Sequence, residues 1–306
     1  MPQRPHLSAL HAGLALLVVL VWGSNFVVIK WALREFPPFF FAALRFFFCA
    51  FPFVFFVRRP QVAWKWLIAY GVLLGAGQFG LLFLAMRADI SPGMTSLVIQ
   101  MQVFFTIGLA VAIFHEKIRG VALFGIVLSA TGLAVIGWHL DATVTLRGVA
   151  LVLAAAFFWA CANIVVKKAA LESKASVPMF AFIVWSSVFA VPPLVAMSAA
   201  FEGLSAGWQA CLAARWDGWA AVAWQSTGNT LFAFAAWSWL LTRYDAAVIS
   251  PWALLVPVFG MASSVIILDE PFPPWKFAAF AMVLGGIAIG SILPALSSRL
   301  RSRRLS

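Results

Sequence analysis

Side-chain amides recur inside stretches of this sequence that are otherwise apolar, and two of them occur in related surroundings. Asn25 belongs to Trp22-Gly-Ser-Asn25, and Asn163 belongs to Trp159-Ala-Cys-Ala-Asn163. An amide both donates and accepts hydrogen bonds, and an indole face attracts cations, so these residues are suited to binding a zwitterion. Polar groups are costly inside an apolar helix, which makes them candidates for a functional site.

Helical spacing extends this set to further apolar stretches, where amides and tryptophans share faces at intervals of three or four residues. The candidate substrate contacts are Trp22, Asn25, Lys30, Arg45, Gln78, Gln100, Gln102, Trp159, Asn163, Asn229, Trp237 and Pro257. Gln225, one turn before Asn229, belongs to the same group of amides. The alternative for each amide is a hydrogen bond to a neighbouring helix that only holds the helices together.

Three candidates would act through charge or backbone geometry. Arg45 lies inside an apolar stretch, where it either snorkels to the membrane surface or faces a wet cavity and attracts a carboxylate. Lys30 has the same two alternatives near the end of its stretch. Pro257 removes one backbone hydrogen bond, so we expect a free carbonyl at Ala253 and a kink confined to the second half of the chain.

The elements that position these residues must lie in a membrane. The chain of 306 residues is 64% hydrophobic and only 10% charged, whereas a soluble domain is about half apolar and about a quarter charged. Its long apolar runs exclude the alternating pattern of a barrel and predict an all-α integral membrane protein with ten transmembrane helices. The expected helices are 8–31, 38–57, 64–86, 92–114, 120–138, 148–169, 177–199, 218–241, 246–268 and 273–294.

The apolar runs form two copies of five. Besides the two tryptophan–amide stretches, a serine precedes a glutamate by the same interval in Ser96 to Glu116 and in Ser250 to Glu270. Because five is odd, the copies would face opposite ways across the membrane, which is the arrangement of inverted-repeat transporters. We expect a first repeat at 1–138, a connecting loop at 139–147, a second repeat at 148–298 and a basic tail at 299–306.

Lysine and arginine give the predicted orientation. They are more frequent in the loops on one side, which places both termini in the cytoplasm. The expected location is the bacterial inner membrane. The net charge of +11 is scattered over loops rather than gathered in a stripe, so we expect no nucleic-acid partner and expect the tail to contact anionic lipid headgroups. A small-molecule substrate and membrane lipids are the expected partners, and a monomer is favoured.

Signatures of catalysis are absent from the sequence. The four histidines lie near the ends of apolar runs, the three cysteines have no regular spacing, and no ATP-binding loop occurs. We therefore expect no enzymatic activity, no metal and no cofactor. Aspartate and glutamate lie only at the ends of runs or in loops, which argues against a proton-driven pump for cations.

Seven segments, spread over nearly the whole chain, resemble the EamA branch of the drug/metabolite transporter superfamily. They are 21–30, 42–46, 77–79, 96–106, 158–168, 183–187 and 250–258. The resemblance implies ten helices in an inverted repeat around a central cavity. The order of these segments is similar to that in exporters of cysteine-pathway metabolites, and this similarity implies a secondary carrier for O-acetylserine or cysteine. Efflux of aromatic or cationic drugs and a membrane scaffold without transport are the alternatives.

Overall fold

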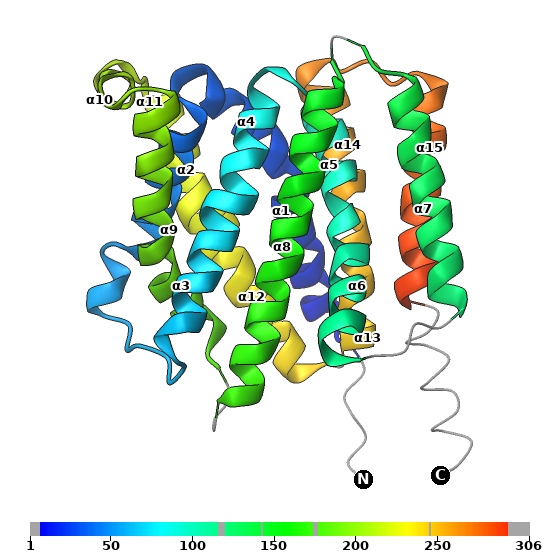
Figure 1. The fold of residues 1–306 in the computed structure, drawn as a ribbon, viewed down its shortest axis with the longest axis horizontal. Helices are drawn as coiled ribbons and strands as arrows, with labels where there is room; N and C mark the ends of the chain where they lie inside the picture. The colour runs from blue at the N-terminus through cyan, green and yellow to red at the C-terminus, as the bar shows by residue number, and fades with distance from the viewer. Residues whose placement is uncertain (1–6, 116–119, 142, 174–176, 245, 293–306) are drawn as a thin grey trace.

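The structure is a computed structural model that describes residues 7–115, 120–141, 143–173, 177–244 and 246–292. Among these residues the regular structure is helical apart from isolated bridges at Ile90, Asp141 and Val144. The helices pack side by side and run between two ends of the molecule (Figure 1). The expected all-helical class is confirmed, whereas the basic tail at 299–306 lies outside the described residues.

The helices of the first half begin and end close to the predicted bounds. They are α1 (Ala9–Glu35), α2 (Pro38–Ala50), η1 (Phe53–Phe55), α3 (Trp64–Val72), η2 (Leu73–Gly80), α4 (Leu81–Ala88), α5 (Pro92–Val98), η3 (Ile99–Met101), α6 (Gln102–Phe114) and α7 (Gly120–Trp138). Each predicted run of the first half therefore contains one helix or an uninterrupted series of helical segments, apart from a short break between α2 and η1.

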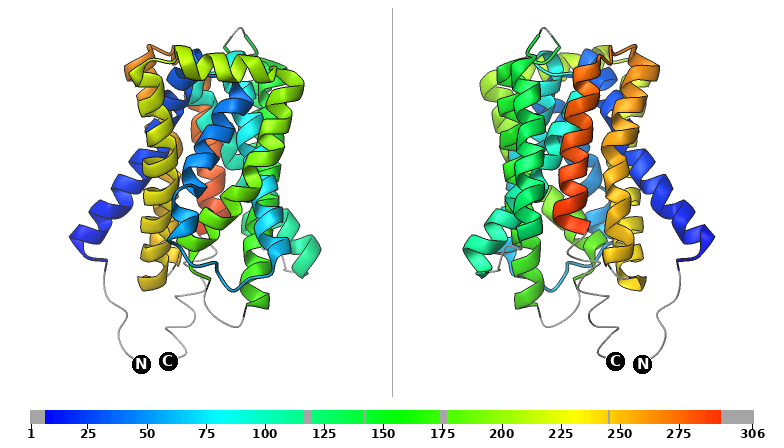
Figure 2. Two further views of the ribbon diagram at one scale, coloured as in Figure 1. Left: turned by 90° about the vertical axis from the view of Figure 1, so that its left-hand side faces the viewer. Right: turned by 90° about the vertical axis from the view of Figure 1, so that its right-hand side faces the viewer.

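The second half follows the same plan with one added helix. Its elements are α8 (Leu146–Glu172), α9 (Met179–Phe201), α10 (Leu204–Ala213), α11 (Trp216–Ala223), η4 (Trp224–Phe232), α12 (Ala233–Arg243), α13 (Ala246–Ile249), η5 (Ser250–Leu254), α14 (Leu255–Leu268), α15 (Pro274–Ile287) and η6 (Ala288–Ile292). The added helix is α10, which lies across one end of the bundle (Figure 2). We call this end the α10 end; α1 begins and η6 ends at the opposite end.

Among the described residues, seven helical stretches are long and apolar enough to cross a membrane. They are Ala9–Glu35, Pro38–Phe55, Trp64–Ala88, Pro92–Phe114, Leu146–Glu172, Met179–Phe201 and Pro251–Leu268. Two shorter apolar helices are Leu123–Trp138 and Pro274–Gly290. The continuous run α11–η4–α12 is not among them, because the polar stretch from Gln225 to Thr230 interrupts its apolar sequence.

Pairs of helices from the two halves pack together in a repeated pattern. The pairs α2 with α9 and α7 with α15 join corresponding helices, and the contact of α1 with α14 is matched by that of α8 with α6. Backbone irregularities recur as well: η2 and η4 are π-helical, and η3 and η5 are 3₁₀-helical. His115 and Asp269, which end α6 and α14, both adopt left-handed backbone conformations with φ of 55° and 53°.

The predicted kink at Pro257 needs correction. A 3₁₀ segment directly precedes α6 in the first half and α14 in the second, so the irregularity is not confined to the second half. Because α14 begins at Leu255, Pro257 lies in its first turn, where a backbone N–H has no partner within the helix. The carbonyl of Ala253 is not free either, since it accepts the backbone N–H of Leu255.

Adjacent glycines on α15 give a test of the packing between α7 and α15. A Cβ at Gly286 would overlap Ser129 Oγ and the carbonyl oxygen of Gly125, whereas a Cβ at Gly285 would stand 3.7 Å from Leu128 Cδ2. We expect Gly286→Ala to lower the free energy of unfolding by about 1–3 kcal/mol, because backbone and a buried hydroxyl must move. Thermal unfolding in detergent measures this change, and Gly285→Ala is the matched control, expected to be neutral or slightly stabilising. Equal melting temperatures for the two variants would contradict the packing.

Candidate functional site

A cavity of about 470 Å³ lies between the two halves of the helical bundle. Nine of the twelve predicted contacts line it: Trp22, Asn25, Gln78, Gln100, Gln102, Trp159, Asn163, Asn229 and Trp237. The rest of the wall is largely apolar and comes from Phe26, Ile29, Phe79, Leu82, Ile99, Phe234, Ala253 and Val256. An apolar cavity with a few convergent polar groups is the usual form of a small-molecule site.

Some of the amides in this cavity are already hydrogen-bonded to neighbouring helices. Asn163 Nδ2 donates to Gln102 Oε1 at 3.1 Å and to Thr106 Oγ1 at 3.2 Å, which joins α8 to α6. Gln225 Nε2 donates to Asn25 Oδ1 at 2.7 Å, which joins η4 to α1. These four amides therefore hold neighbouring helices together, which was the alternative to substrate binding, because their polar groups bond to one another or to Thr106 across helices.

Three other amides in the wall have no such partner. Within the described part of the chain, the side chains of Gln78, Gln100 and Asn229 make no hydrogen bond. Gln78 is only 3% exposed, and its Oε1 is buried. A buried polar group without a partner is costly, whichever way its amide is turned. These three side chains are therefore the ones free to bind a ligand.

Two of the free amides occupy matching positions in the π-helical segments. Gln78 is the sixth residue of η2, which begins at Leu73, and Asn229 is the sixth residue of η4, which begins at Trp224. Short π-helical stretches inside α-helices are frequent at functional sites. The two halves thus each present one free amide to the cavity from the same kind of backbone.

Aromatic rings form one side of the cavity and are held in place by one another. The Trp22 ring lies 5.2 Å from the ring centroids of both Phe234 and Trp237. Trp22 Nε1 also donates to the backbone carbonyl of Asn229 at 3.3 Å. Because its N–H is engaged, Trp22 offers the cavity its apolar surface, which is suited to methylene groups or a cation.

Arg45 corresponds to neither of the alternatives that the sequence allowed. Its side chain is 0% exposed, so it does not snorkel, and it is not part of the cavity wall. The guanidinium donates to Thr230 Oγ1 from Nε at 3.1 Å and from Nη2 at 2.8 Å, and to Gln225 Oε1 from Nη1 at 3.0 Å. It also stacks on Phe79, with its central carbon 3.6 Å from the ring centroid. Arg45 thus lies directly behind two residues of the wall, Phe79 and, through Gln225, Asn25.

Lys30 and Pro257 also lie outside the cavity wall. Lys30 Nζ donates to the carbonyl oxygens of Met86 at 2.9 Å and Arg87 at 3.2 Å, so it caps the C-terminal end of α4. Pro257 is buried in the first turn of α14, and only Ala253 and Val256 of that region reach the cavity. The sequence could not distinguish these positions, because it does not show which face of each helix the cavity meets.

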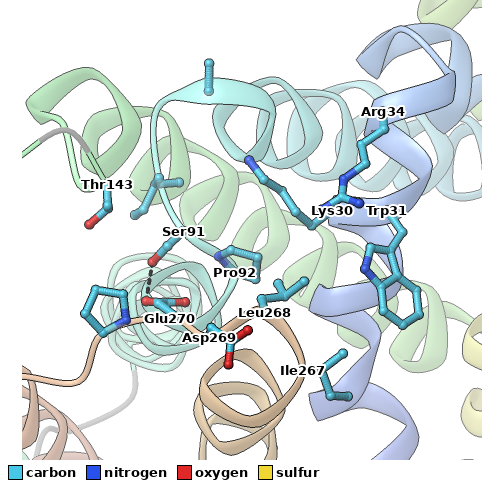
Figure 3. A pocket seen from close by; sticks show the side chains of 13 residues that line it. Lys30, Trp31, Arg34, Ser91, Pro92, Thr143, Ile267, Leu268, Asp269 and Glu270 are labelled. Atoms are coloured by element: carbon cyan, nitrogen blue, oxygen red, sulfur yellow. Dashed lines mark hydrogen bonds between the residues drawn. The ribbon is translucent and has the colours of Figure 1, made fainter.

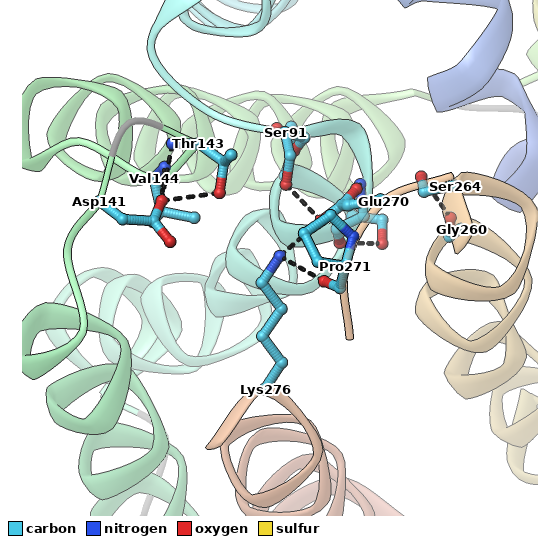
Figure 4. A network of polar contacts seen from close by, with 12 residues as sticks. Ser91, Asp141, Thr143, Val144, Gly260, Ser264, Glu270, Pro271 and Lys276 are labelled. Atoms are coloured by element: carbon cyan, nitrogen blue, oxygen red, sulfur yellow. Dashed lines mark hydrogen bonds and ion pairs between the residues drawn. The ribbon is translucent and has the colours of Figure 1, made fainter. Parts of the chain in front are cut away.

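A second hollow, of about 570 Å³, lies at the α10 end, and the sequence did not indicate it. We call this second hollow the vestibule. Figure 3 shows Lys30 and Arg34 of α1 on one side of it and Asp269 and Glu270, which follow α14, on the other. Glu270 forms an ion pair with Lys276 at 3.0 Å, and the two side chains are 5% and 1% exposed (Figure 4). The interval from Ser250 to Glu270 was the only sequence signal for Glu270.

A known protein family matches this chain in two segments, one in each half of the chain. The EamA-like transporter family matches residues 10–138 and 146–292. Two relatives named "Probable amino-acid metabolite efflux pump", from Salmonella typhimurium and Escherichia coli, are each 37% identical over 282 residues, covering 90% of this chain and 93% of the relative. A solved structure titled "Crystal structure of protein" has a TM-score of 0.60 at 18% identity, covering 93% of this chain and 98% of its own, which is a likeness of fold.

Proposed function

Because this chain belongs to the EamA-like transporter family, we propose that it exports small amino-acid-like metabolites by alternating access through the central cavity. The observation that carries this proposal is the set of unpartnered amides in an otherwise apolar cavity. Relatives named as probable amino-acid metabolite efflux pumps support both the substrate class and the outward direction. Cysteine and O-acetylserine are the substrates that we propose to test first.

The chemistry of the cavity supports a substrate that carries both an ammonium and a carboxylate or ester. The amides of Gln78, Gln100 and Asn229 each carry an acceptor suited to an ammonium proton and N–H donors suited to carboxylate or ester oxygens. Arg45 supplies a positive charge behind the wall that favours a negatively charged group on the substrate. The aromatic wall takes the apolar part of the molecule.

The repeated packing of the two halves supports the transport mechanism. In this proposal ten transmembrane helices form two inverted repeats, at 1–138 and 148–298, joined by 139–147, and they rock about the cavity. Matching π segments and matching pairs of helices support this symmetry. We propose the bacterial inner membrane as the location, with both termini and the loop containing Arg58 and Arg59 in the cytoplasm and the α10 end outside.

Substrate counterflow tests the proposal and does not require that a coupling ion be identified. Proteoliposomes are loaded with unlabelled cysteine or O-acetylserine and diluted into a trace of the labelled compound. We expect transient accumulation of the label above its equilibrium level, because a carrier exchanges substrate across the membrane. Gln100→Leu should abolish the overshoot, because it removes a free amide from the cavity. Equal accumulation in empty and loaded vesicles would contradict a carrier for these substrates.

One observation favours a second substrate class. Trp22, Trp159, Trp237 and Phe234 give the cavity an aromatic wall that also fits planar or cationic drugs. No aspartate or glutamate is among the residues that line the cavity in the described part of the chain, so such a cation would lack a counter-charge. The same counterflow assay with a cationic dye distinguishes the two classes.

A further inference from the structure

Glu270, the acidic member of the ion pair at the α10 end, also joins the two halves of the molecule. Glu270, which follows α14, accepts hydrogen bonds from Ser91 Oγ at 2.5 Å and from the backbone N–H of Gly93 at 3.1 Å, both at the start of α5. It also accepts from Lys276 Nζ of α15 at 3.0 Å, and the same Nζ donates to the carbonyl of Pro271 at 3.0 Å. We call Ser91, Gly93, Glu270 and Lys276 the latch; most of it is drawn in Figure 4.

The latch has no room for substitution at its centre. A Cβ at Gly93 would come within 2.8 Å of Met261 Sδ and 2.9 Å of Glu270 Oε2. Ser91, the residue before α5, does not cap that helix with its own side chain; its hydroxyl donates to Glu270 instead. The first turn of α5 therefore depends on a carboxylate from the other half of the chain for one of its N–H partners.

The latch lies beside the barrier between the two hollows. On α14, Val256 lines the central cavity and Ile267 lines the vestibule; on the α5–η3–α6 run, Ile99 lines the cavity and Pro92 the vestibule. Residues 93–98, between Pro92 and Ile99, are all buried, and on α14 the residues Gly260, Met261 and Ser264 are buried.

We call the packed residues Ser96, Gly260 and Met261 the plug. Ser96 and Met261 are buried, and a Cβ at Gly260 would come within 2.5 Å of Ser96 Cβ. The plug thus closes the cavity toward the α10 end by contact between α5 of the first half and α14 of the second.

We infer that the vestibule is the outer mouth of the translocation pathway and that the latch is its gate. This inference rests on the alternating access of the proposed function. Breaking the contacts of Glu270 with Ser91 and Gly93 frees α5 from the segment between α14 and α15. The plug then separates and connects the vestibule to the cavity.

The chemistry of the latch suits a contact that must both hold and release. In the closed state the two charges neutralise each other while they are nearly excluded from water. When α5 moves away, water from the vestibule reaches Glu270 and Lys276 and replaces the lost hydrogen bonds. An apolar contact of the same size would not regain such compensation, so the pair holds the closed state without preventing opening.

Cysteine labelling tests the gate separately from transport. Ser96→Cys places a thiol in the plug, in a background whose native Cys49, Cys161 and Cys211 are replaced by alanine. A membrane-impermeant thiol reagent is added to right-side-out or to inverted vesicles. With the latch intact we expect slow labelling from the α10 side. Glu270→Gln and Lys276→Met each weaken the pair, and each is expected to raise the labelling rate from that side about tenfold or more.

Glu202→Gln is the matched control. Glu202 also accepts backbone N–H groups from the other half, those of Phe39 at 2.7 Å and Phe40 at 3.1 Å at the start of α2. It is not part of the vestibule or the plug, so its variant should leave the labelling rate unchanged.

Unchanged labelling in both latch variants, or an equal rise in Glu202→Gln, would overturn the gate. If Glu270→Gln does not fold, Lys276→Met decides. Faster labelling of a protein that shows no counterflow would support the gate and contradict the proposed substrates, so the two proposals fail separately.

Discussion

An Arg45→Met protein is expected to prefer cysteine over cysteine methyl ester about 15-fold less strongly than the parent protein does. The guanidinium is fully buried, and its hydrogen bonds go to the neutral side chains of Thr230 and Gln225, so within the described part of the chain no carboxylate offsets its charge beside the cavity. A carboxylate at about 10 Å from this charge, in an effective dielectric of about 20, gains about 1.7 kcal/mol, which corresponds to that factor. The methyl ester has no carboxylate and does not gain this energy.

Competition against a labelled substrate in detergent measures both affinities in the same preparation. Their ratio reports the effect of charge and is unaffected by the fraction of protein that has folded. Arg45→Lys should retain most of the preference, because the charge stays although the planar fork is lost. Arg147→Gln is the control for loss of a positive charge, since that side chain is 68% exposed and is not part of the cavity wall. A preference that survives Arg45→Met unchanged would exclude a role for this charge in substrate selection.

The identity of the cavity residues was predictable from the sequence because the solvent is a bilayer. Amides such as Asn25, Gln100 and Asn163 are rare enough in apolar helices to mark a polar interior, and helical spacing groups them on faces. Nine predicted residues therefore line one cavity. That they bind substrate stays a prediction.

What the sequence could not provide is the state of each polar group. Whether an amide is free or paired depends on the residue opposite, and Asn163 differs from Gln78 only because Gln102 and Thr106 lie within its reach. For the same reason the sequence did not indicate that Arg45 bonds to another helix. Its acceptors Thr230 and Gln225 lie in η4, about 180 residues away in the chain. The pair of Glu270 and Lys276 is a related case, since a turn through three prolines folds the two charges together.

The distinction between free and paired amides predicts stability changes of opposite sign. Gln78→Met removes a buried polar group without a partner, so we expect the melting temperature to stay the same or rise. Asn163→Leu removes the amide that donates to Gln102 Oε1 and Thr106 Oγ1, so we expect a loss of about 1–3 kcal/mol in the free energy of unfolding. Thermal unfolding of the purified variants in detergent measures both changes.

Substrate affinity should fall most in the variants that lose a free amide, although these variants keep their stability. Gln78→Met and Asn229→Leu each remove a free amide from a matching position in η2 and η4, and each is expected to weaken substrate binding about tenfold. The double variant should lose more than either single variant, because the two amides approach the substrate from different halves. Asn163→Leu should weaken binding less than Gln78→Met in the protein that remains folded. A Gln78→Met protein that is less stable than the parent, with unchanged affinity, would show that this amide is structural, and the assignment of free amides to substrate would fail with it.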